Sequence, residues 1–198
     1  IAQKSDLVTE ISAYVTELAC NDYRLWKKNL PQTFYVTINL SGKDIQSQSF
    51  TDRLAKILGD SGMNPKNIAL EITECALTDD AKQSIEALRK CREMGASIFV
   101  DDFGTGYSSL SYLSVLPLDI LKIHRSFVND IETNEHNRLI ATSTIHLAKG
   151  LGLKVIAEGI ETHAQKDLLT GLGCDKAQGS FFAAPMTAGE LMKWLPKA

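Results

Sequence analysis

The sequence predicts an α/β fold in which parallel strands alternate with helices, and it favours a modified (β/α)8 barrel of the TIM type. Six short apolar segments have strand character, and each is followed by a helix-like segment or a helical turn. This alternation indicates parallel strands joined by right-handed crossovers. Polar residues recur near the strand ends. A barrel would bring these ends onto one rim, whereas an open sheet would spread them along an edge.

The chain opens with a long amphipathic helix over residues 6–28, whose apolar residues recur at helical spacing: Leu7, Ile11, Val15, Leu18, Ala19 and Leu25. The strands are expected at residues 34–39, 68–72, 97–100, 120–123, 153–157 and 177–181. Helices are expected over residues 45–58, 79–94, 128–149, 163–172 and 188–195, with another starting near Ser108. A barrel of this type usually has eight strands. The remaining strands are therefore expected upstream of Ile1, and residues 1–198 are interpreted as one domain that is incomplete at its N-terminus.

Composition and charge exclude several classes of protein. The chain of 198 residues has a formal net charge of −3, so it has no basic surface of the kind that attracts DNA, RNA or an anionic membrane. No apolar run approaches the length of a membrane span, and no segment of the 198 residues resembles a signal peptide. The scattered cysteines, Cys20, Cys75, Cys91 and Cys174, lack metal-ligand spacing, which indicates reduced, mostly buried thiols in a cytoplasmic domain.

Residues 100–110, V-D-D-F-G-T-G-Y-S-S-L, form the most informative stretch. An apolar strand ends in Asp101 and Asp102, and Gly104 and Gly106 then break the backbone before the next helix. Two like charges about 4 Å apart repel by about 4 kcal/mol at an effective dielectric constant near 20, so a partly enclosed pair favours a cation. In the alternative interpretation, Asp101 is structural and Asp102 only caps the turn. The polar ends of the other strands favour the cation site.

The other strand ends carry polar residues of matching chemistry: Asn39, Glu71, Lys122, Glu158 and Gln178. Five of the strand-end residues form an all-oxygen set that suits magnesium or manganese and disfavours zinc or copper: Asn39, Glu71, Asp101, Asp102 and Glu158. Several carboxylates against a single lysine leave room for two ions, an arrangement that promotes phosphodiester hydrolysis. Lys122 would then orient or deprotonate a water, or neutralise charge on a phosphate. Its alternative role is a structural ion pair with one acid.

The chain resembles the EAL-domain family of cyclic di-GMP phosphodiesterases, which are modified (β/α) barrels of bacterial signalling. The resemblance rests on several motifs in order: N-L-S at 39–41, E-I-T-E at 71–74, D-D-F-G-T-G-Y-S-S-L at 101–110, A-E-G-I-E-T at 157–162 and Q-G at 178–179. It extends over residues 1–195. The resemblance implies metal-dependent hydrolysis of cyclic di-GMP to linear pGpG, with two Mg²⁺ or Mn²⁺ ions as cofactors.

The resemblance also implies roles for individual residues. The family's metal ligands match Asn39, Glu71, Asp101 and Glu158, and its second-metal ligand matches Asp102. The catalytic candidates are Lys122, which matches the residue that positions the attacking water, Glu161 and Glu74. Glu161 and Gln178 match supporting positions around the water and substrate. Glu74 and the loop 104–109 match an element that links the metal site to a dimer interface, so a homodimer is expected. Leu40 and Ser41 are expected at the substrate. Tyr107 is a candidate for stacking on a guanine, with ordinary packing as the alternative.

The sequence departs from the family pattern at two points. The Glu-Ala-Leu triplet that names the family lies on its first strand, and the matching region is expected before Ile1. The triplet Glu86-Ala87-Leu88 lies within a predicted helix and is not that site. The family usually reads K-I-D after the fourth of these strands, whereas this chain reads Lys122-Ile123-His124. A histidine in place of an acceptor-only aspartate would disturb a neighbouring cation or weaken substrate binding.

An alternative interpretation is a catalytically inactive EAL domain that binds cyclic di-GMP as a receptor or acts as a dimerisation module. A different metal-dependent barrel enzyme, such as an enolising lyase, would need another substrate. Sensor, cyclase or membrane-anchor domains upstream in the same polypeptide are compatible with the sequence. Direct membrane contact by the domain itself is not expected.

Overall fold

The computed structural model describes residues 7–28, 30–31, 33–73, 76, 81–105 and 113–195. These residues divide between two compact units. Unit 1 comprises Ile1–Ile72, Ala76–Ile98 and Met186–Ala198, and unit 2 comprises Thr73–Cys75 and Phe99–Pro185. The strands follow one another in the order β1-β2-β3-β4-β5-β6, and every recorded strand pair is parallel. The α/β class with parallel strands is therefore confirmed.

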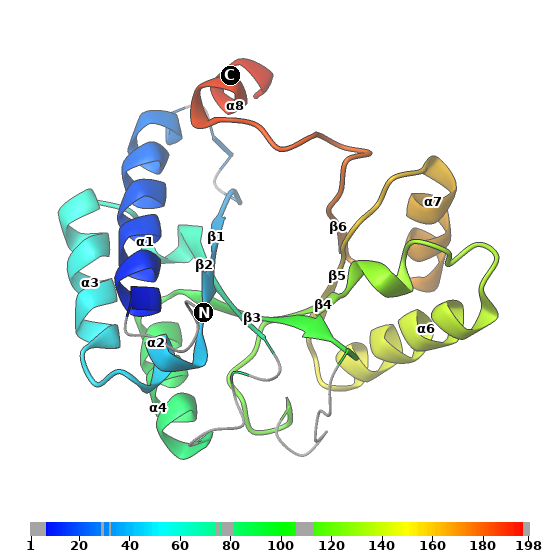
Figure 1. The fold of residues 1–198 in the computed structure, drawn as a ribbon, viewed down its shortest axis with the longest axis horizontal. Helices are drawn as coiled ribbons and strands as arrows, with labels where there is room; N and C mark the ends of the chain where they lie inside the picture. Colours follow the sequence, from blue (N-terminus) through cyan, green and yellow to red (C-terminus); the bar gives the residue numbers. More distant parts are fainter. Residues whose placement is uncertain are drawn as a thin grey trace. The chain divides into compact units, whose positions relative to one another are not determined.

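Unit 1 contains the first strands and the helices that cover them (Figure 1). Its elements are α1 (Leu7–Trp26), β1 (Val36–Leu40), α2 (Gly42–Gln46), α3 (Phe50–Ser61), the short 3-10 helix Pro65–Asn67, β2 (Ile68–Thr73, whose last residue belongs to unit 2), α4 (Ala81–Met94) and α8 (Ala188–Trp194). Strand β2 is almost completely buried, with β-branched and aliphatic side chains on both faces. Leu54 and Leu58 of α3 and Leu88 of α4 complete the core.

Unit 2 contains most of β3 (Ser97–Phe103), followed by β4 (Ile120–Ile123), the 3-10 turn Arg125–Phe127, α6 (Glu135–Gly150), β5 (Lys154–Ala157), α7 (His163–Leu172) and β6 (Lys176–Ala177). All four residues of β4 are buried, as expected for a central strand of a parallel sheet. Helix α6 packs against β4 and β5. Its N-cap Asn134 accepts hydrogen bonds from the backbone N–H groups of His136 and Asn137, so the helix begins sharply.

Several predicted elements differ from the observed ones. The helix expected over residues 45–58 is two helices, α2 and α3, separated at Ser47, where the backbone is extended. The helix expected from Val128 starts only at Glu135. The strand expected over 177–181 is the short β6. No described helix has both the length and the apolar character needed to cross a membrane.

Helix α1 is amphipathic as predicted, but its predicted apolar stripe does not face the core. The buried residues of α1 are Thr16, Cys20, Tyr23 and Trp26. Most of the larger apolar residues that reveal the helix in the sequence are exposed to solvent: Leu7, Ile11, Val15, Leu18 and Leu25.

Candidate active site

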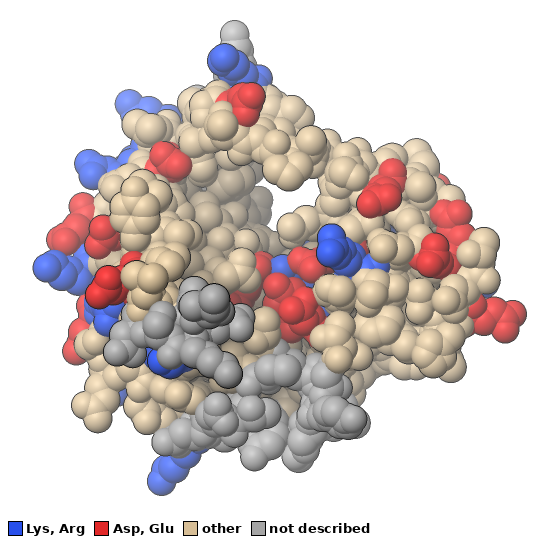
Figure 2. Space-filling model, viewed as in Figure 1, with Lys and Arg blue, Asp and Glu red and all other residues tan. Residues whose placement is uncertain are grey.

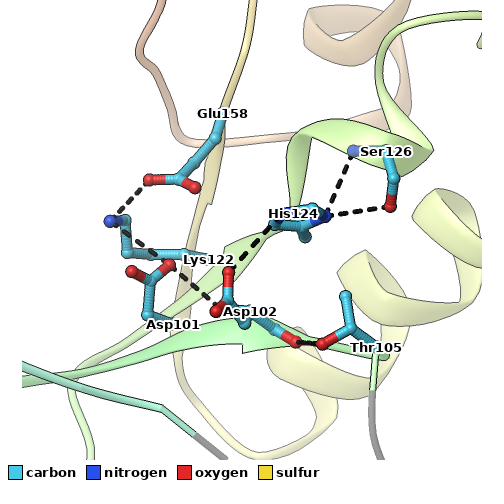
Figure 3. Close-up of polar contacts among 7 residues, drawn as sticks. All are labelled: Asp101, Asp102, Thr105, Lys122, His124, Ser126 and Glu158. Carbon is cyan, nitrogen blue, oxygen red and sulfur yellow. Dashed lines mark hydrogen bonds and ion pairs between the residues drawn. The ribbon is translucent and has the colours of Figure 1, made fainter. Parts of the chain in front are cut away.

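Two of the acids predicted at the strand ends of unit 2, Asp101 and Glu158, contact one buried lysine, Lys122 (Figure 3). Asp101 and Asp102 lie in β3, Lys122 lies in β4, and Glu158 directly follows β5. Because these neighbouring strands are parallel, their carboxyl ends lie at the same edge of the sheet. Figure 2 shows acidic and basic side chains side by side where β3 and β4 lie in Figure 1.

Lys122 bridges two carboxylates. Its Nζ lies 2.5 Å from Oε1 of Glu158 and 3.4 Å from Oδ1 of Asp101. The lysine is 2% exposed, and the two acid side chains are about one-sixth exposed, at 15% and 18%. In such a poorly hydrated position the ammonium group neutralises acids that would otherwise repel one another. Lys122 therefore contacts two acids, whereas the structural alternative predicted from the sequence is an ion pair with one acid.

The two adjacent aspartates point in different directions because the strand is irregular between them. The register of β3 with β4 shifts between Val100 and Phe103, as in a β-bulge. Asp102 has a φ of 57°, which is uncommon for a residue other than glycine. Its backbone N–H donates to Oδ1 of Asp101 at 2.9 Å, and its carbonyl oxygen accepts from the hydroxyl of Thr105 at 2.8 Å. These two bonds hold the left-handed conformation, which strained functional sites often contain.

The carboxylate of Asp102 faces His124 and not Lys122. Nε2 of His124 lies 3.6 Å from Oδ1 of Asp102. The other ring nitrogen, Nδ1, accepts the backbone N–H of Ser126 at 3.2 Å and lies 2.9 Å from its hydroxyl, so His124 caps the 3-10 turn Arg125–Phe127. When the ring is neutral, this cap places its proton on Nε2, toward Asp102. The residue that departs from the family pattern is thus both a structural cap and a neighbour of the candidate site.

Glu161 and Gln178 lie on segments that are joined by backbone hydrogen bonds beyond β5 and β6. The N–H of Gln178 donates to the carbonyl of Ala157 at 2.9 Å, and the N–H of Ile160 donates to the carbonyl of Gln178 at 3.0 Å. The backbone N–H of Glu161 donates at 2.7 Å to Oε1 of Gln165, the same oxygen that accepts the Thr162 N–H in the capping box of α7. Both predicted site residues are exposed. Their backbones are fixed while their side chains remain accessible.

In unit 1 the structure brings Asn39 and Glu71 together. They are register partners on the parallel strands β1 and β2, so their side chains lie on the same face. Asn39 is exposed, whereas Glu71 is only 4% exposed. Leu40 is buried on the opposite face, beside residues of α1 and α3 such as Thr16 and Leu54.

Asp44 is a site-supporting residue that the sequence analysis does not identify. Ser41 is the N-cap of α2, and its hydroxyl donates to Oδ2 of Asp44 at 2.6 Å. The same carboxylate oxygen accepts the Ser41 N–H at 2.8 Å and the hydroxyl of Ser12 at 2.9 Å. Asp44 is 1% exposed. Through its hydrogen bonds with Ser41 and Ser12, it links the turn after Asn39 to helix α1. The available signal is the capping-box spacing S-x-x-D at Ser41 and Asp44.

Several predicted site residues do not belong to the group around Lys122 in unit 2. Glu74, Tyr107 and most of the loop 104–109 lie outside the described residues. Asn39 and Glu71 belong to unit 1, and the acids around Lys122 belong to unit 2. Among the described residues, no three histidine, cysteine or acidic side chains form a group that could hold a metal ion.

The string Glu86-Ala87-Leu88 lies on helix α4, as predicted. Leu88 is fully buried in unit 1, whereas Glu86 and Ala87 line a surface cavity of about 860 Å³ beside the α2–α3 connection. None of the three residues is on a strand, which confirms that this triplet is not the family's strand motif.

Parallel strands that end in carboxylates around a buried lysine define an α/β protein of the barrel class, whose sites lie at the carboxyl ends of its strands. The family model described as "EAL domain" matches residues 1–185, and the chain belongs to the EAL domain family.

Known proteins similar to this chain share its fold. The bifunctional diguanylate cyclase/cyclic di-GMP phosphodiesterase MucR of Pseudomonas aeruginosa is 36% identical over 192 residues, which cover 97% of this chain and 28% of that protein. The solved complex of the PaMucR phosphodiesterase with c-di-GMP is 37% identical, with a TM-score of 0.90, and the match covers 96% of this chain and 77% of that one. A manganese/cy-diGMP complex of Klebsiella pneumoniae BlrP1 is 25% identical, with a TM-score of 0.82 and 91% and 45% coverage. The chain spans less than a third of the length of the curated relatives it matches.

Proposed function

We propose that this chain is a phosphodiesterase domain that hydrolyses cyclic di-GMP to linear pGpG in bacterial second-messenger signalling. The observation that carries the proposal is the placement of Lys122 between Asp101 and Glu158 at the carboxyl ends of neighbouring strands. Family membership and the c-di-GMP bound by the similar MucR structure support this choice of substrate.

The donor set fits divalent metal ions by its chemistry. The candidate ligands are an amide and four carboxylates, Asn39, Glu71, Asp101, Asp102 and Glu158. Of the three acids in unit 2, Asp101 and Glu158 contact Lys122 and Asp102 faces His124, so three carboxylates lie near one lysine. Oxygen ligands of this type suit Mg²⁺ or Mn²⁺, and we propose two such ions as cofactors. The manganese complex of the similar BlrP1 structure agrees with this choice. When bound, the ions supply Lewis-acid polarisation of the phosphate and lower the pKa of a water.

We assign the other roles, which are orienting the water, offsetting charge on the phosphate and binding the substrate, to residues of the chain. Lys122 holds an ammonium group where a phosphate oxygen and the attacking water meet the acids, so it orients the water and offsets charge that develops on phosphorus. Addition of this water across one P–O bond opens the cyclic dinucleotide and leaves pGpG. We place Glu161, Gln178 and Glu74 as supporting residues, and Ser41 and Tyr107 at the substrate. Because the side chain of Leu40 is buried, we propose that only its backbone approaches the substrate.

The test is incubation of the protein with cyclic di-GMP and Mg²⁺ or Mn²⁺, followed by chromatographic detection of pGpG. The Glu158→Gln variant keeps the size of the side chain but removes the charge, and it should abolish product formation. Glu135→Gln, which changes an exposed acid in the first turn of α6, should leave turnover intact. Full activity of Glu158→Gln would refute the site assignment.

A second candidate function is supported by His124. Its ring lies beside Asp102, the candidate second-metal ligand, where the family usually has an aspartate, and this change favours a domain that binds cyclic di-GMP without cleaving it. Isothermal calorimetry separates the two functions. Saturable binding without pGpG would identify a receptor, and turnover would identify the enzyme.

We further propose that the domain is cytoplasmic, forms a homodimer near Glu74 and the loop 104–109, and works beside sensor or cyclase domains of a longer polypeptide. The described cysteines carry free thiols, and Cys20 and Cys91 are buried, as expected for a reducing compartment. The greater length of the curated relatives agrees with additional domains. Sedimentation measurements and fractionation of the native host protein test these proposals.

A further inference from the structure

The segment of residues 158–162, between β5 and α7, carries two candidate site residues, Glu158 and Glu161. Its first residue still follows the sheet, because the N–H of Glu158 donates to the carbonyl of Ile123 at 3.1 Å, and its side chain reaches Lys122 (Figure 3). The regular pairing of β4 with β5 stops before this segment. Contacts outside the sheet therefore decide where Glu161 lies relative to Lys122.

Gln165, in the first turn of α7, is a side chain that makes such contacts. Its Oε1 accepts the N–H of Glu161 at 2.7 Å and the N–H of Thr162 at 3.1 Å. Its Nε2 donates to the carbonyl oxygen of Asn129 at 2.9 Å, and Asn129 lies shortly after the 3-10 turn Arg125–Phe127 on the chain that leaves β4. Gln165 is 4% exposed, so water competes little for these bonds. One buried amide thus joins the segment after β5 to the segment after β4.

The same two segments meet directly at Gly159. This residue has a φ of 73°, and a Cβ atom at its position would overlap the Cβ of Arg125. It would also lie 3.7 Å from Oδ1 of Asn129. The chain after β5 therefore lies against the chain after β4, and Gln165 fixes the end of this contact that carries Glu161.

The hydrogen bonds of Gln165 exceed what the start of a helix requires. In the capping box of α7, Thr162 and Gln165 exchange hydrogen bonds, and a glutamate could make the same exchange because its side chain needs only to accept. The bond to Asn129 needs a donor on the same side chain, which a carboxylate lacks and an amide has. It lies outside the capping box, and so does the bond from Glu161. Gln165 therefore does more than begin α7.

We propose that Gln165 is a positioning residue of the candidate active site, where it holds the backbone of Glu161 at the place that hydrolysis of cyclic di-GMP requires. The inference rests on the proposed function. Because its side chain is buried, Gln165 acts through Glu161 and not by contact with the substrate. Its loss should therefore lower kcat with little change in KM, since a displaced group impairs the reaction more than it impairs binding.

Gln165→Glu tests the bond to Asn129. The variant keeps the length of the side chain and both accepted bonds, but it places a carboxylate oxygen against the carbonyl of Asn129. Steady-state formation of pGpG with Mn²⁺ should give a kcat that is roughly tenfold lower and a KM within about twofold of the wild-type value. A glutamine that only began the helix would give a wild-type kcat in this variant, because glutamate completes the capping box equally well.

Two further variants separate positioning from stability. Gln165→Met removes every hydrogen bond of the amide without adding a charge, and it should lower kcat at least as much. Thr162→Ala is the matched control, because it removes the hydroxyl that accepts the N–H of Gln165 at 3.1 Å but leaves the amide bonds of Gln165 in place. The other bond of this hydroxyl, to Glu132, is exposed. The control should lower the melting temperature and keep a wild-type kcat.

Three results would each overturn this proposal while the phosphodiesterase function stands: a wild-type kcat in Gln165→Glu or Gln165→Met, a fall in kcat that Thr162→Ala shares in full, or a raised KM at an unchanged kcat. A wild-type protein that forms no pGpG would refute the proposed function and this inference with it, so the two failures are distinguishable. Far-UV circular dichroism sets the assay temperature below the unfolding of every variant.

Discussion

Lys122 illustrates how a buried charge is stabilised at the edge of a parallel sheet. Removing an ammonium group from water costs several kcal/mol, and the contacts with Asp101 and Glu158 offset this cost. The same contacts leave the positive charge at the edge where the strands end. A residue that only stabilised the fold could form its ion pair anywhere on the surface. The position of Lys122 between two candidate ligands favours a role in the reaction.

Lys122→Gln should both destabilise the protein and abolish turnover. The substitution leaves two poorly hydrated carboxylates facing each other without a cation, so the free energy of unfolding should fall by about 3 kcal/mol. Urea denaturation measures the stability, and pGpG formation measures the activity. Lys154→Gln, at the exposed start of β5, is the control and should change neither quantity appreciably. If Lys122→Gln were as stable as the wild-type protein, the ion pairs would contribute nothing to the free energy of unfolding.

His124→Asp should increase turnover of cyclic di-GMP, by roughly tenfold at a fixed Mn²⁺ concentration, because it adds a carboxylate beside Asp102 and removes an N–H donor that competes for it. Aspartate is also a good N-cap, so the turn Arg125–Phe127 should persist and the melting temperature should change little. The control is His124→Asn, which keeps the cap without the charge. Equal turnover by the two variants would show that charge at this position does not matter.

The sequence predicts where the candidate site residues of unit 2 lie along the strands, but it does not predict the directions of their side chains. Asp101, Lys122 and Glu158 follow apolar strand segments, so their position at the strand ends is a direct consequence of strand length. The left-handed conformation of Asp102 arises from the register shift against β4, a partner far along the chain. The pairing of Asp102 with His124 depends on the same shift. No local pattern contains this information.

At the scale of elements, the segment after β6 depends on one glycine. Gly179 lies so close to the backbone of Ile160 that a Cβ atom would overlap its nitrogen and carbonyl oxygen. This close approach allows Ile160 to accept from Phe181 at 3.0 Å and to donate to Gln178 at 3.0 Å. The hydrogen bonds hold Gln178 next to the segment that carries Glu158 and Glu161. They extend the pairing of β5 and β6 beyond the regular strands.

Gly179→Ala should separate these two segments. The added methyl group would meet backbone atoms that cannot rotate away, so a loss of about 1–3 kcal/mol in the free energy of unfolding is expected. Activity should fall further than stability, since Gln178 and Glu161 lie on the displaced segments. Gly171→Ala in α7 is the control, because no atom lies near its Cβ position and alanine is a better helix former there. Chemical denaturation and pGpG assays on both variants provide the comparison. An unchanged Gly179→Ala protein would contradict the close approach.

The sequence predicted the order and type of the described elements better than their boundaries. Strand β4 matches its predicted range because the short apolar run is bounded by polar residues. The break between α2 and α3 lies at Ser47, beside Gln46, whose carbonyl accepts from Nε2 of Gln83 on α4 at 2.7 Å. Such a contact over a long sequence separation ends a helix without leaving a helical stop signal nearby. The exposed stripe of α1 was likewise unpredictable, because periodicity shows that a helix has an apolar side but not what covers it.

At the scale of the whole molecule, the described contacts form two compact units. The prediction of one domain over residues 1–198 stays a prediction. Strand β3 starts in unit 1 and continues into unit 2, so the chain passes between the units inside a regular element. Hydrophobic periodicity carries no signal for such a division, because each unit has its own parallel strands with covering helices. Asn39 and Glu71 belong to unit 1, and Asp101, Asp102 and Glu158 belong to unit 2.

Stability at alkaline pH offers a measurement of folding that is independent of the candidate site. Cys91 of α4 is fully buried, and burial raises the pKa of its thiol from 9.0 to about 12. The unfolded chain therefore releases this proton at a lower pH than the folded chain, so the stabilisation is complete below pH 9.0 and is lost as the pH rises toward 12. From about pH 8 to about pH 10 the free energy of unfolding should fall by about 1.4 kcal/mol through this thiol alone.

Comparison with Cys91→Ala isolates this contribution, because the other titrating groups are common to both proteins. The variant should be less stable at neutral pH, as it leaves a small cavity in the core of unit 1. Its stability should then decline less steeply above pH 9, so the two curves of unfolding free energy against pH converge. Urea denaturation at a series of alkaline pH values measures both curves. Parallel curves would mean that the thiolate is as well accommodated in the folded protein as in the unfolded chain, and that Cys91 is not held in an apolar core.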